Sequence, residues 1–114
     1  MKRMLAAVAL AALATVLPAT ASSATGAAPV YKGTVGPGFT IALAKKPTKA
    51  GKITLAVSDR SSIHDFHLTG PGVNVKTSIG GTGTKTFQLT LKKGTYRYVC
   101  DPHASIMHGS FTIR

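Results

Sequence analysis

The sequence has very little negative charge and almost no cysteine. Its 114 residues contain three Asp, no Glu and a single Cys, against 14 Lys and Arg, which gives a formal net charge of +11. One cysteine cannot form the internal disulfides that stabilise many small exported domains. A bound metal can stabilise such a domain instead. A lone thiol in an exported chain is a reactive group, an intermolecular link or a metal ligand, and this composition favours the ligand.

No hydrophobic run is long enough to span a bilayer comfortably. The longest, residues 5–17, has about 13 residues, where about 20 are needed. Lys2 and Arg3 precede it and Ala-Thr-Ala follows at residues 19–21, so we predict a signal peptide over residues 1–21, with an uncleaved anchor as the alternative. No Cys lies near the cleavage point and no twin-Arg pair is present, which disfavours a lipoprotein and folded export. We expect an exported protein, periplasmic or extracellular and envelope-associated, with no integral membrane segment after cleavage.

The scarcity of carboxylates also restricts the partners. After residue 21 the chain keeps 12 Lys and Arg against its three Asp, and such a field attracts anionic partners. The lysines are scattered rather than interleaved with aromatic residues, which disfavours nucleic acid. We expect a monomer that meets a larger redox protein with an acidic docking surface, or an anionic envelope surface. Simple solubility is the alternative explanation.

Alternation of apolar and polar residues dominates the rest of the chain. Residues 22–29 are small and polar and are expected to be a flexible lead-in, followed by one domain over residues 30–114. Period-2 patterns separated by Gly- and Pro-rich turns predict strands. They lie at residues 30–35, 39–44, 52–57, 63–68, 86–91, 95–100 and 110–114, with a further short strand at 73–75. These strands favour an all-β fold, an antiparallel sandwich or barrel.

The same alternation assigns side chains to faces of the predicted strands. If Cys100 points inward, then Tyr98 and Tyr96 do too. The run Leu-Lys-Lys-Gly-Thr-Tyr at residues 91–96 has the form of a tyrosine corner, in which the Tyr hydroxyl bonds back to the preceding loop.

The predicted strand at residues 63–68 contains two histidines. His64 shares its inward face with Phe66 and Leu68, whereas Asp65 and His67 fall on the outward face. We therefore expect His64 to need a partner inside the protein, and His67 to be an ordinary solvated histidine.

One short stretch concentrates the soft ligands. Cys100, His103 and Met107 follow each other closely, and His64 comes from a distant strand. Two imidazoles and a thiolate, with a weak thioether on the axis, are the ligands of a blue-copper site. Each of these residues alone is more often a packing or surface residue, and only the combination is specific. Thiolate and imidazole accept both Cu(I) and Cu(II), so the expected cofactor is one copper ion.

These motifs resemble the cupredoxins, among them plastocyanin, pseudoazurin and amicyanin. The likeness rests on His-Asp-Phe-His-Leu at residues 64–68, on residues 91–103, and on Met-His-Gly-Ser-Phe-Thr-Ile at residues 107–113. It implies a Greek-key β-sandwich of seven to eight strands, with copper ligands at His64, Cys100, His103 and Met107. His108 is an alternative axial ligand, but the family's spacing to Gly109 and Phe111 favours Met107.

One departure from the family concerns the residue after the first ligand histidine. It is usually Asn, which ties the two ligand loops together, but here it is Asp65, and Asp101 follows the cysteine. We expect these carboxylates to face each other behind the copper with a proton or a cation between them. Arg60, His67 or a lysine could supply that cation. With Asp65 and Asp101, Tyr96 is expected to support the ligands.

The resemblance implies a one-electron carrier between redox partners and not an enzyme. Electrons would leave through His103, surrounded by an apolar patch of Pro37, Phe39, Ile63, Pro102, Ala104 and Ile106. A carrier, chaperone or buffer of copper would use the same ligands and remains the alternative. Copper enzymes of this kind resemble assemblies of several cupredoxin domains with additional histidine-rich centres, for which four His are too few.

Overall fold

The computed structural model describes residue 12 and residues 26–114. Apart from residue 12, the predicted signal peptide lies outside the described residues and stays a prediction, as does the division into a lead-in and one domain. Within the described part of the chain, no helix has both the length and the apolar character needed to cross a membrane.

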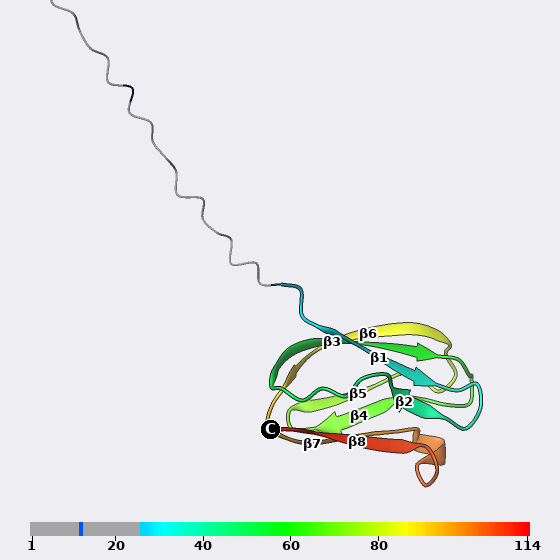
Figure 1. Cartoon of the computed structure of the whole chain (residues 1–114). Coiled ribbons are helices and arrows are strands. Elements are labelled where there is room, and N and C mark those ends of the chain that lie inside the picture. Colours follow the sequence, from blue (N-terminus) through cyan, green and yellow to red (C-terminus); the bar gives the residue numbers. More distant parts are fainter. Residues whose placement is uncertain (1–11, 13–25) are drawn as a thin grey trace, which may run out of the picture.

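Eight strands form two four-stranded sheets that pack face to face (Figure 1). In the first sheet the order is β2-β1-β3-β6, and in the second it is β5-β4-β7-β8. The strands are β1 (Val30–Val35), β2 (Ile41–Leu43), β3 (Gly51–Asp59), β4 (His67–Gly70), β5 (Val73–Lys76), β6 (Gly83–Leu91), β7 (Gly94–Val99) and β8 (His108–Ile113). The predicted all-β sandwich of seven to eight strands is confirmed.

One strand pairing is parallel, whereas an antiparallel fold was predicted. β1 runs parallel to β3, with Val30 opposite Thr54 and Val35 opposite Asp59. The short strand β2 pairs antiparallel with the other edge of β1. As a consequence β1 and β3 begin at the same end of the sandwich, and the chain preceding β1 reaches the domain there.

The core is built from the inward residues of both sheets. In β3 the buried positions alternate, with Ile53, Leu55 and Val57 inside, and burying each such side chain contributes about 1.5–3 kcal/mol. The core also contains stacked aromatic pairs: Tyr96 of β7 lies on Phe111 of β8 with ring centroids 5.1 Å apart, and Phe66 lies on Tyr98 with centroids 5.5 Å apart. This pattern confirms that period-2 alternation placed the core correctly.

The strand that leads to the cysteine is fixed by the predicted tyrosine corner. Tyr96 donates a hydrogen bond to the carbonyl of Pro71 (2.8 Å) and accepts one from the backbone N–H of Lys92 (2.9 Å). Tyr96, Tyr98 and Cys100 are all buried, as their common face predicted. The tyrosine corner therefore fixes the register of β7, and with it the buried position of Cys100 directly after the strand.

The predicted strand at residues 63–68 is mostly a loop, because β4 begins only at His67. The assignment of Asp65 to an outward face is wrong, since His64, Asp65 and Phe66 are all fully buried. The loop is tied down by a reciprocal pair: the backbone N–H of Phe66 donates to the Thr77 hydroxyl (2.9 Å), and the N–H of Thr77 donates to the Phe66 carbonyl (3.0 Å). Outside a ladder, successive side chains need not alternate between faces.

Candidate metal centre

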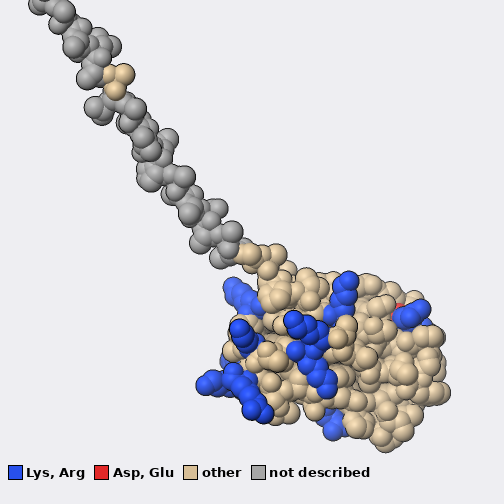
Figure 2. Space-filling model, in the orientation of Figure 1, with Lys and Arg blue, Asp and Glu red and all other residues tan. Residues whose placement is uncertain are grey.

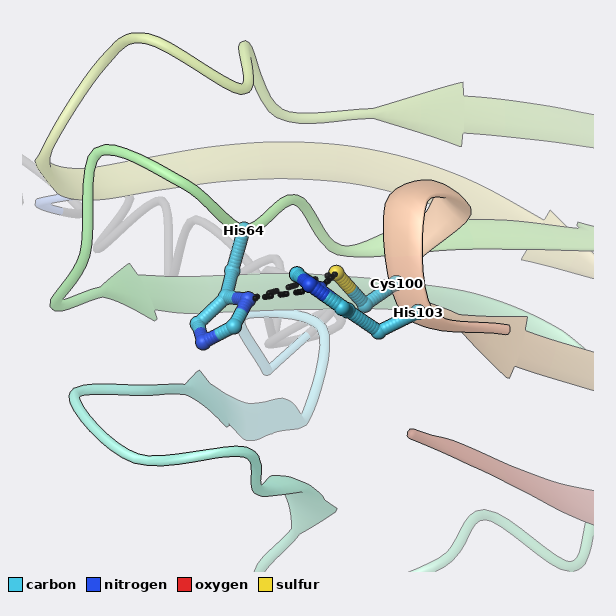
Figure 3. A group of neighbouring side chains, drawn as sticks. All are labelled: His64, Cys100 and His103. Carbon is cyan, nitrogen blue, oxygen red and sulfur yellow. Dashed lines mark hydrogen bonds between the residues drawn. The ribbon is translucent and has the colours of Figure 1, made fainter. Parts of the chain in front are cut away.

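Three predicted metal-binding side chains meet at one end of the sandwich (Figure 3). His64 comes from the β3–β4 loop, Cys100 follows β7, and His103 ends the short 3₁₀ helix η1 (Asp101–His103). The Cys100 sulfur lies 3.6 Å from Nδ1 of His64 and 3.5 Å from Nδ1 of His103, and the two Nδ1 atoms are 3.1 Å apart. Donors that are 36 residues apart in the chain therefore converge on one point.

The loop between β7 and β8 holds itself in shape through its own backbone. The N–H of His103 donates to the Cys100 carbonyl (3.0 Å), and the N–H of Met107 donates to the His103 carbonyl (2.8 Å). The N–H of Cys100 in turn donates to the Met107 carbonyl (3.0 Å), which closes the loop. Met107 is only 1% exposed, whereas His108 is exposed at the start of β8. The buried sulfur of Met107 thus belongs to the same loop as two of the converging donors.

A glycine allows the end of β1 to pack closely against His64. Gly36 has φ of +72°, which favours glycine. A Cβ at this position would lie 2.9 Å from Cβ of Ser61 and 3.3 Å from Cδ2 of His64. Any other residue at Gly36 would clash with Ser61 and crowd the imidazole of His64.

Phe39 covers both imidazoles from the solvent side. Its ring centroid lies 5.3 Å from that of His64 and 5.0 Å from that of His103, in edge-on geometry. The same ring is 58% exposed. Phe39 therefore both shields the two histidines from water and presents an apolar surface directly above them.

The predicted apolar patch lies at the surface. Ile63 and Ile106 are 52% and 63% exposed, and with Phe39 they make up three of the five exposed large hydrophobic residues of the described chain. The remaining predicted members are exposed or half-buried: Pro37, Pro102, Ala104 and His103. Large apolar side chains gathered at one site on a small protein are typical of a surface that meets a partner.

The donor set fits copper. Two Nδ1 atoms 3.1 Å apart cannot both carry a proton, so at least one of them is unprotonated and has a lone pair that a metal ion could take in place of the shared proton. Burial raises the pKa of the Cys100 thiol above its ordinary value, so a thiolate here needs a cation beside it. One thiolate and two imidazoles are soft and borderline ligands that suit copper. Together these three residues could hold a metal ion, since their donor atoms all lie within 4.8 Å of one another.

Asp65 links the two segments that carry the converging donors. Its Oδ1 accepts a hydrogen bond from the backbone N–H of Asp101 at 2.6 Å. Burial and the nearby Asp101 carboxylate raise the pKa of Asp65 to about 6. The contact with Asp65 lowers the pKa of Asp101. As predicted, two carboxylates lie close together behind the cluster, and their mutual repulsion makes Asp65 harder to ionise.

His67 is not the solvated histidine that the sequence suggested. Its Nδ1 lies 2.9 and 3.0 Å from the two carboxylate oxygens of Asp101, and its Nε2 lies 2.7 Å from Oδ1 of Asn74. Although partial burial opposes it, these hydrogen bonds raise the pKa of His67. Arg60, His67 and a lysine were the candidate cations for the carboxylate pair, and the structure shows His67 bonded to Asp101. No sequence pattern indicated that Asn74 would bind His67.

The hydroxyl of Tyr96 does not bond to the cluster, because its partners are the backbone groups of Lys92 and Pro71. Its expected support of the ligands is therefore indirect, through the position of β7, and stays a prediction.

A two-sheet β-sandwich with a buried cysteine and two imidazoles at one end defines a small copper protein of the cupredoxin class. The model of the family of copper binding proteins described as the plastocyanin/azurin family matches residues 24–114. The chain belongs to this family, and copper is its cofactor. No curated protein matches the chain significantly.

Solved structures with the same fold include blue copper proteins. Reduced rusticyanin is 21% identical with a TM-score of 0.60, over 79% of this chain and 81% of its own. Reduced auracyanin from Roseiflexus castenholzii is 21% identical with a TM-score of 0.55, over 78% of this chain and 99% of its own. Auracyanin A, a "blue" copper protein from Chloroflexus aurantiacus, is 16% identical with a TM-score of 0.51, over 75% and 98%. At these identities the similarity shows a shared fold.

Proposed function

We propose that the protein is an exported carrier of single electrons, with one copper ion held by His64, Cys100, His103 and Met107. The observation that carries this proposal is the convergence of the Cys100 sulfur and two Nδ1 atoms within 3.1–3.6 Å. When bound, copper supplies a one-electron couple between Cu(I) and Cu(II). The chain's own contribution is to hold the donors still and keep water away from them.

The surroundings of the donors suit that task. His64 and Cys100 are fully buried, and three backbone hydrogen bonds fix the loop that carries Cys100, His103 and Met107. Ligands that are locked by packing and by hydrogen bonds keep their positions when the charge of the site changes. A site that rearranges little exchanges an electron with a low barrier, which favours a carrier.

Met107 is the better candidate for the axial position. It is buried in the loop that also provides Cys100 and His103, whereas His108 is exposed on β8. An exposed side chain at that point would have to turn into the core to reach the cluster. We therefore assign the weak axial bond to the Met107 thioether.

Electrons would enter and leave through His103, beneath Phe39 and the apolar patch around it. A patch of this kind docks weakly and releases quickly, as the small interfaces of electron-transfer complexes do. The partner is a larger redox protein with an acidic docking surface. Arg60, Lys76 and Lys85 are exposed at this end of the molecule, and their charge would speed the encounter more than it strengthens the complex.

The proposed compartment rests on the sequence alone. The basic and apolar residues 1–17 and the Ala-Thr-Ala motif support export with cleavage after Ala21. The mature protein would then act as a monomer in the periplasm or at the outer side of the envelope, and would not catalyse a reaction of its own.

The experiment that tests the function compares electron exchange with copper release. The mature chain, loaded with Cu(II), should give a reversible one-electron wave in voltammetry and lose copper slowly to a competing chelator. Fast copper loss without reversible electron exchange would instead support the copper-handling alternative, in which the same residues pass the ion on.

A further inference from the structure

Positive charge gathers at the end of the sandwich that is remote from the metal centre (Figure 2). We call this region the cationic end. It consists of exposed residues on the β2–β3 loop, the start of β3, the β6–β7 turn and the residue after β8: Lys45, Lys46, Lys49, Lys52, Lys92, Lys93 and Arg114.

Strand pairing brings these separate segments together. Gly51 lies opposite Leu91, so the start of β3 adjoins the turn that carries Lys92 and Lys93. Gly94 lies opposite Ile113, and the N–H of Arg114 donates to the carbonyl of Thr48 in the β2–β3 loop (3.5 Å). Lysines that look scattered in the sequence therefore form one surface.

No side-chain carboxylate neutralises the lysines of the cationic end. The three Asp of the chain lie toward the other end: Asp59 is the last residue of β3, and Asp65 and Asp101 adjoin the metal centre. Such an unpaired set of exposed cations produces a field that reaches about 8–10 Å into solution at physiological salt.

The cationic end is too far from the metal centre to serve electron transfer directly. β3 runs from one end to the other, and from Lys52 to Asp59 it spans about 23 Å at about 3.3 Å per residue. A redox protein docked on the cationic end would be separated from His103 by the whole domain. A partner bound there leaves the apolar patch free.

We propose that the cationic end binds the surface of an anionic lipid bilayer and turns the metal centre away from it. Six of its seven cations are lysines, which act as flexible point charges and suit headgroups that are not held in a fixed geometry. Juxtamembrane lysines are attracted to anionic leaflets in just this manner. The site at the opposite end then faces the redox partners.

The path of the chain supports a bilayer over an acidic protein as the occupant. The segment preceding β1 enters the domain at the cationic end, where the N–H of Thr54 donates to the carbonyl of Pro29 (2.9 Å). Val30, the first residue of β1, is 58% exposed there. Before cleavage, the apolar residues 5–17 precede this entry point in the sequence, and a weak apolar segment together with a polybasic surface gives stable anchoring where one alone is marginal. After cleavage at Ala21 the cationic end alone would hold the protein to the bilayer, reversibly.

The test measures sedimentation of the copper-loaded full chain with vesicles of phosphatidylcholine, alone or mixed with phosphatidylglycerol. We expect strong binding to the mixed vesicles only, weakened by high salt. The triple variant Lys49→Gln/Lys92→Gln/Lys93→Gln should bind about 100-fold more weakly, since each lysine near the surface contributes roughly fivefold. The control Arg60→Gln/Lys76→Gln/Lys85→Gln has the same net charge but lies toward the metal centre, and it should stay within about threefold of the unaltered chain.

Several outcomes would overturn the proposal. Equal weakening by both triple variants would show that only net charge matters. Equal binding to both kinds of vesicle would assign the attraction to the apolar N-terminal residues, and binding to neither would remove the bilayer. If soluble polyglutamate, rather than the vesicles, selects the cationic end over the control positions, the occupant is an acidic protein. Because Lys49, Lys92 and Lys93 are remote from the metal centre, a failure here leaves the proposed electron transfer untouched.

Discussion

The carboxylate of Asp65 accepts a 2.6 Å hydrogen bond from the backbone N–H of Asp101, and so joins the segment that carries His64 to the segment that carries Cys100. Asp65 is fully buried, and its Oδ2 has no hydrogen-bond partner in the described structure. The contact fixes the spacing of two donors while placing a carboxylate directly behind them.

Two substitutions of Asp65 distinguish the effect of its hydrogen bond from the effect of its charge. Asp65→Asn keeps an oxygen acceptor for the Asp101 N–H, removes a negative charge near the copper, and should raise the reduction potential because that charge stabilises Cu(II) over Cu(I). Asp65→Ala removes the acceptor as well and should cost about 1–3 kcal/mol of unfolding free energy. Voltammetry and denaturation measure the two effects. A potential in the Asn variant that is equal or lower would contradict the electrostatic role.

The His67–Asp101 pair should stabilise the copper-free protein over a limited pH range. His67 has a pKa above its ordinary value of 6.5, and Asp101 has a pKa below its ordinary value of 3.8. The stabilisation is therefore present between these two values. It is lost as pH rises through the raised pKa of His67, or falls through the lowered pKa of Asp101.

His67→Gln should accordingly lower the unfolding free energy by about 0.5 kcal/mol near pH 5.5, a small effect because the pair is partly exposed and screened by solvent. The difference should shrink once the pH exceeds the raised pKa of His67. Urea denaturation at several pH values measures the difference. Combining His67→Gln with Asp101→Asn gives the coupling between the two residues. A coupling that does not change with pH would rule out an ionic contribution.

Met107 and His108 can be distinguished as axial ligands by a pair of substitutions. Met107→Leu keeps a similar volume but removes the thioether, so it should retain the blue colour and raise the reduction potential. His108→Ala, at the neighbouring exposed position, should change neither property. If His108→Ala shifts the spectrum and Met107→Leu does not, the axial assignment is reversed.

Tyr96→Phe tests whether the tyrosine corner acts only on stability. The substitution leaves the Lys92 N–H and the Pro71 carbonyl without their partner and should cost about 1–3 kcal/mol. The copper spectrum should stay the same, because the hydroxyl does not bond to the cluster. An altered spectrum would extend the role of Tyr96 to the metal centre, and an unchanged melting temperature would remove its structural role.

The strands and much of the metal centre could be predicted because they rest on local patterns. Period-2 alternation placed β1, β3 and β7 nearly to the residue, and the common face of Tyr96, Tyr98 and Cys100 followed from it. The Cys-His-Met spacing predicted a loop that the structure closes through its own backbone. These features depend on neighbours in sequence.

The features that escaped prediction depend on contacts between distant segments. The period-2 pattern placed Asp65 outside because we extended the strand over residues that form a loop. In that loop Asp65 turns inward and accepts a hydrogen bond from the N–H of Asp101. The partners of His67 come from another strand and another loop. The clustering of lysines likewise appears only once β3, β6 and the chain end are paired.

Binding of Cu(II) to the mature chain and to Cys100→Ser, followed by electronic absorption and paramagnetic resonance, tests the central claim most directly. The unaltered protein should bind one equivalent with intense thiolate-to-copper absorption and a narrow paramagnetic splitting. Both should vanish in the serine variant, which keeps the two histidines. Weak absorption and a wide splitting in the unaltered protein would show that the Cys100 sulfur does not bind copper, and would contradict the account.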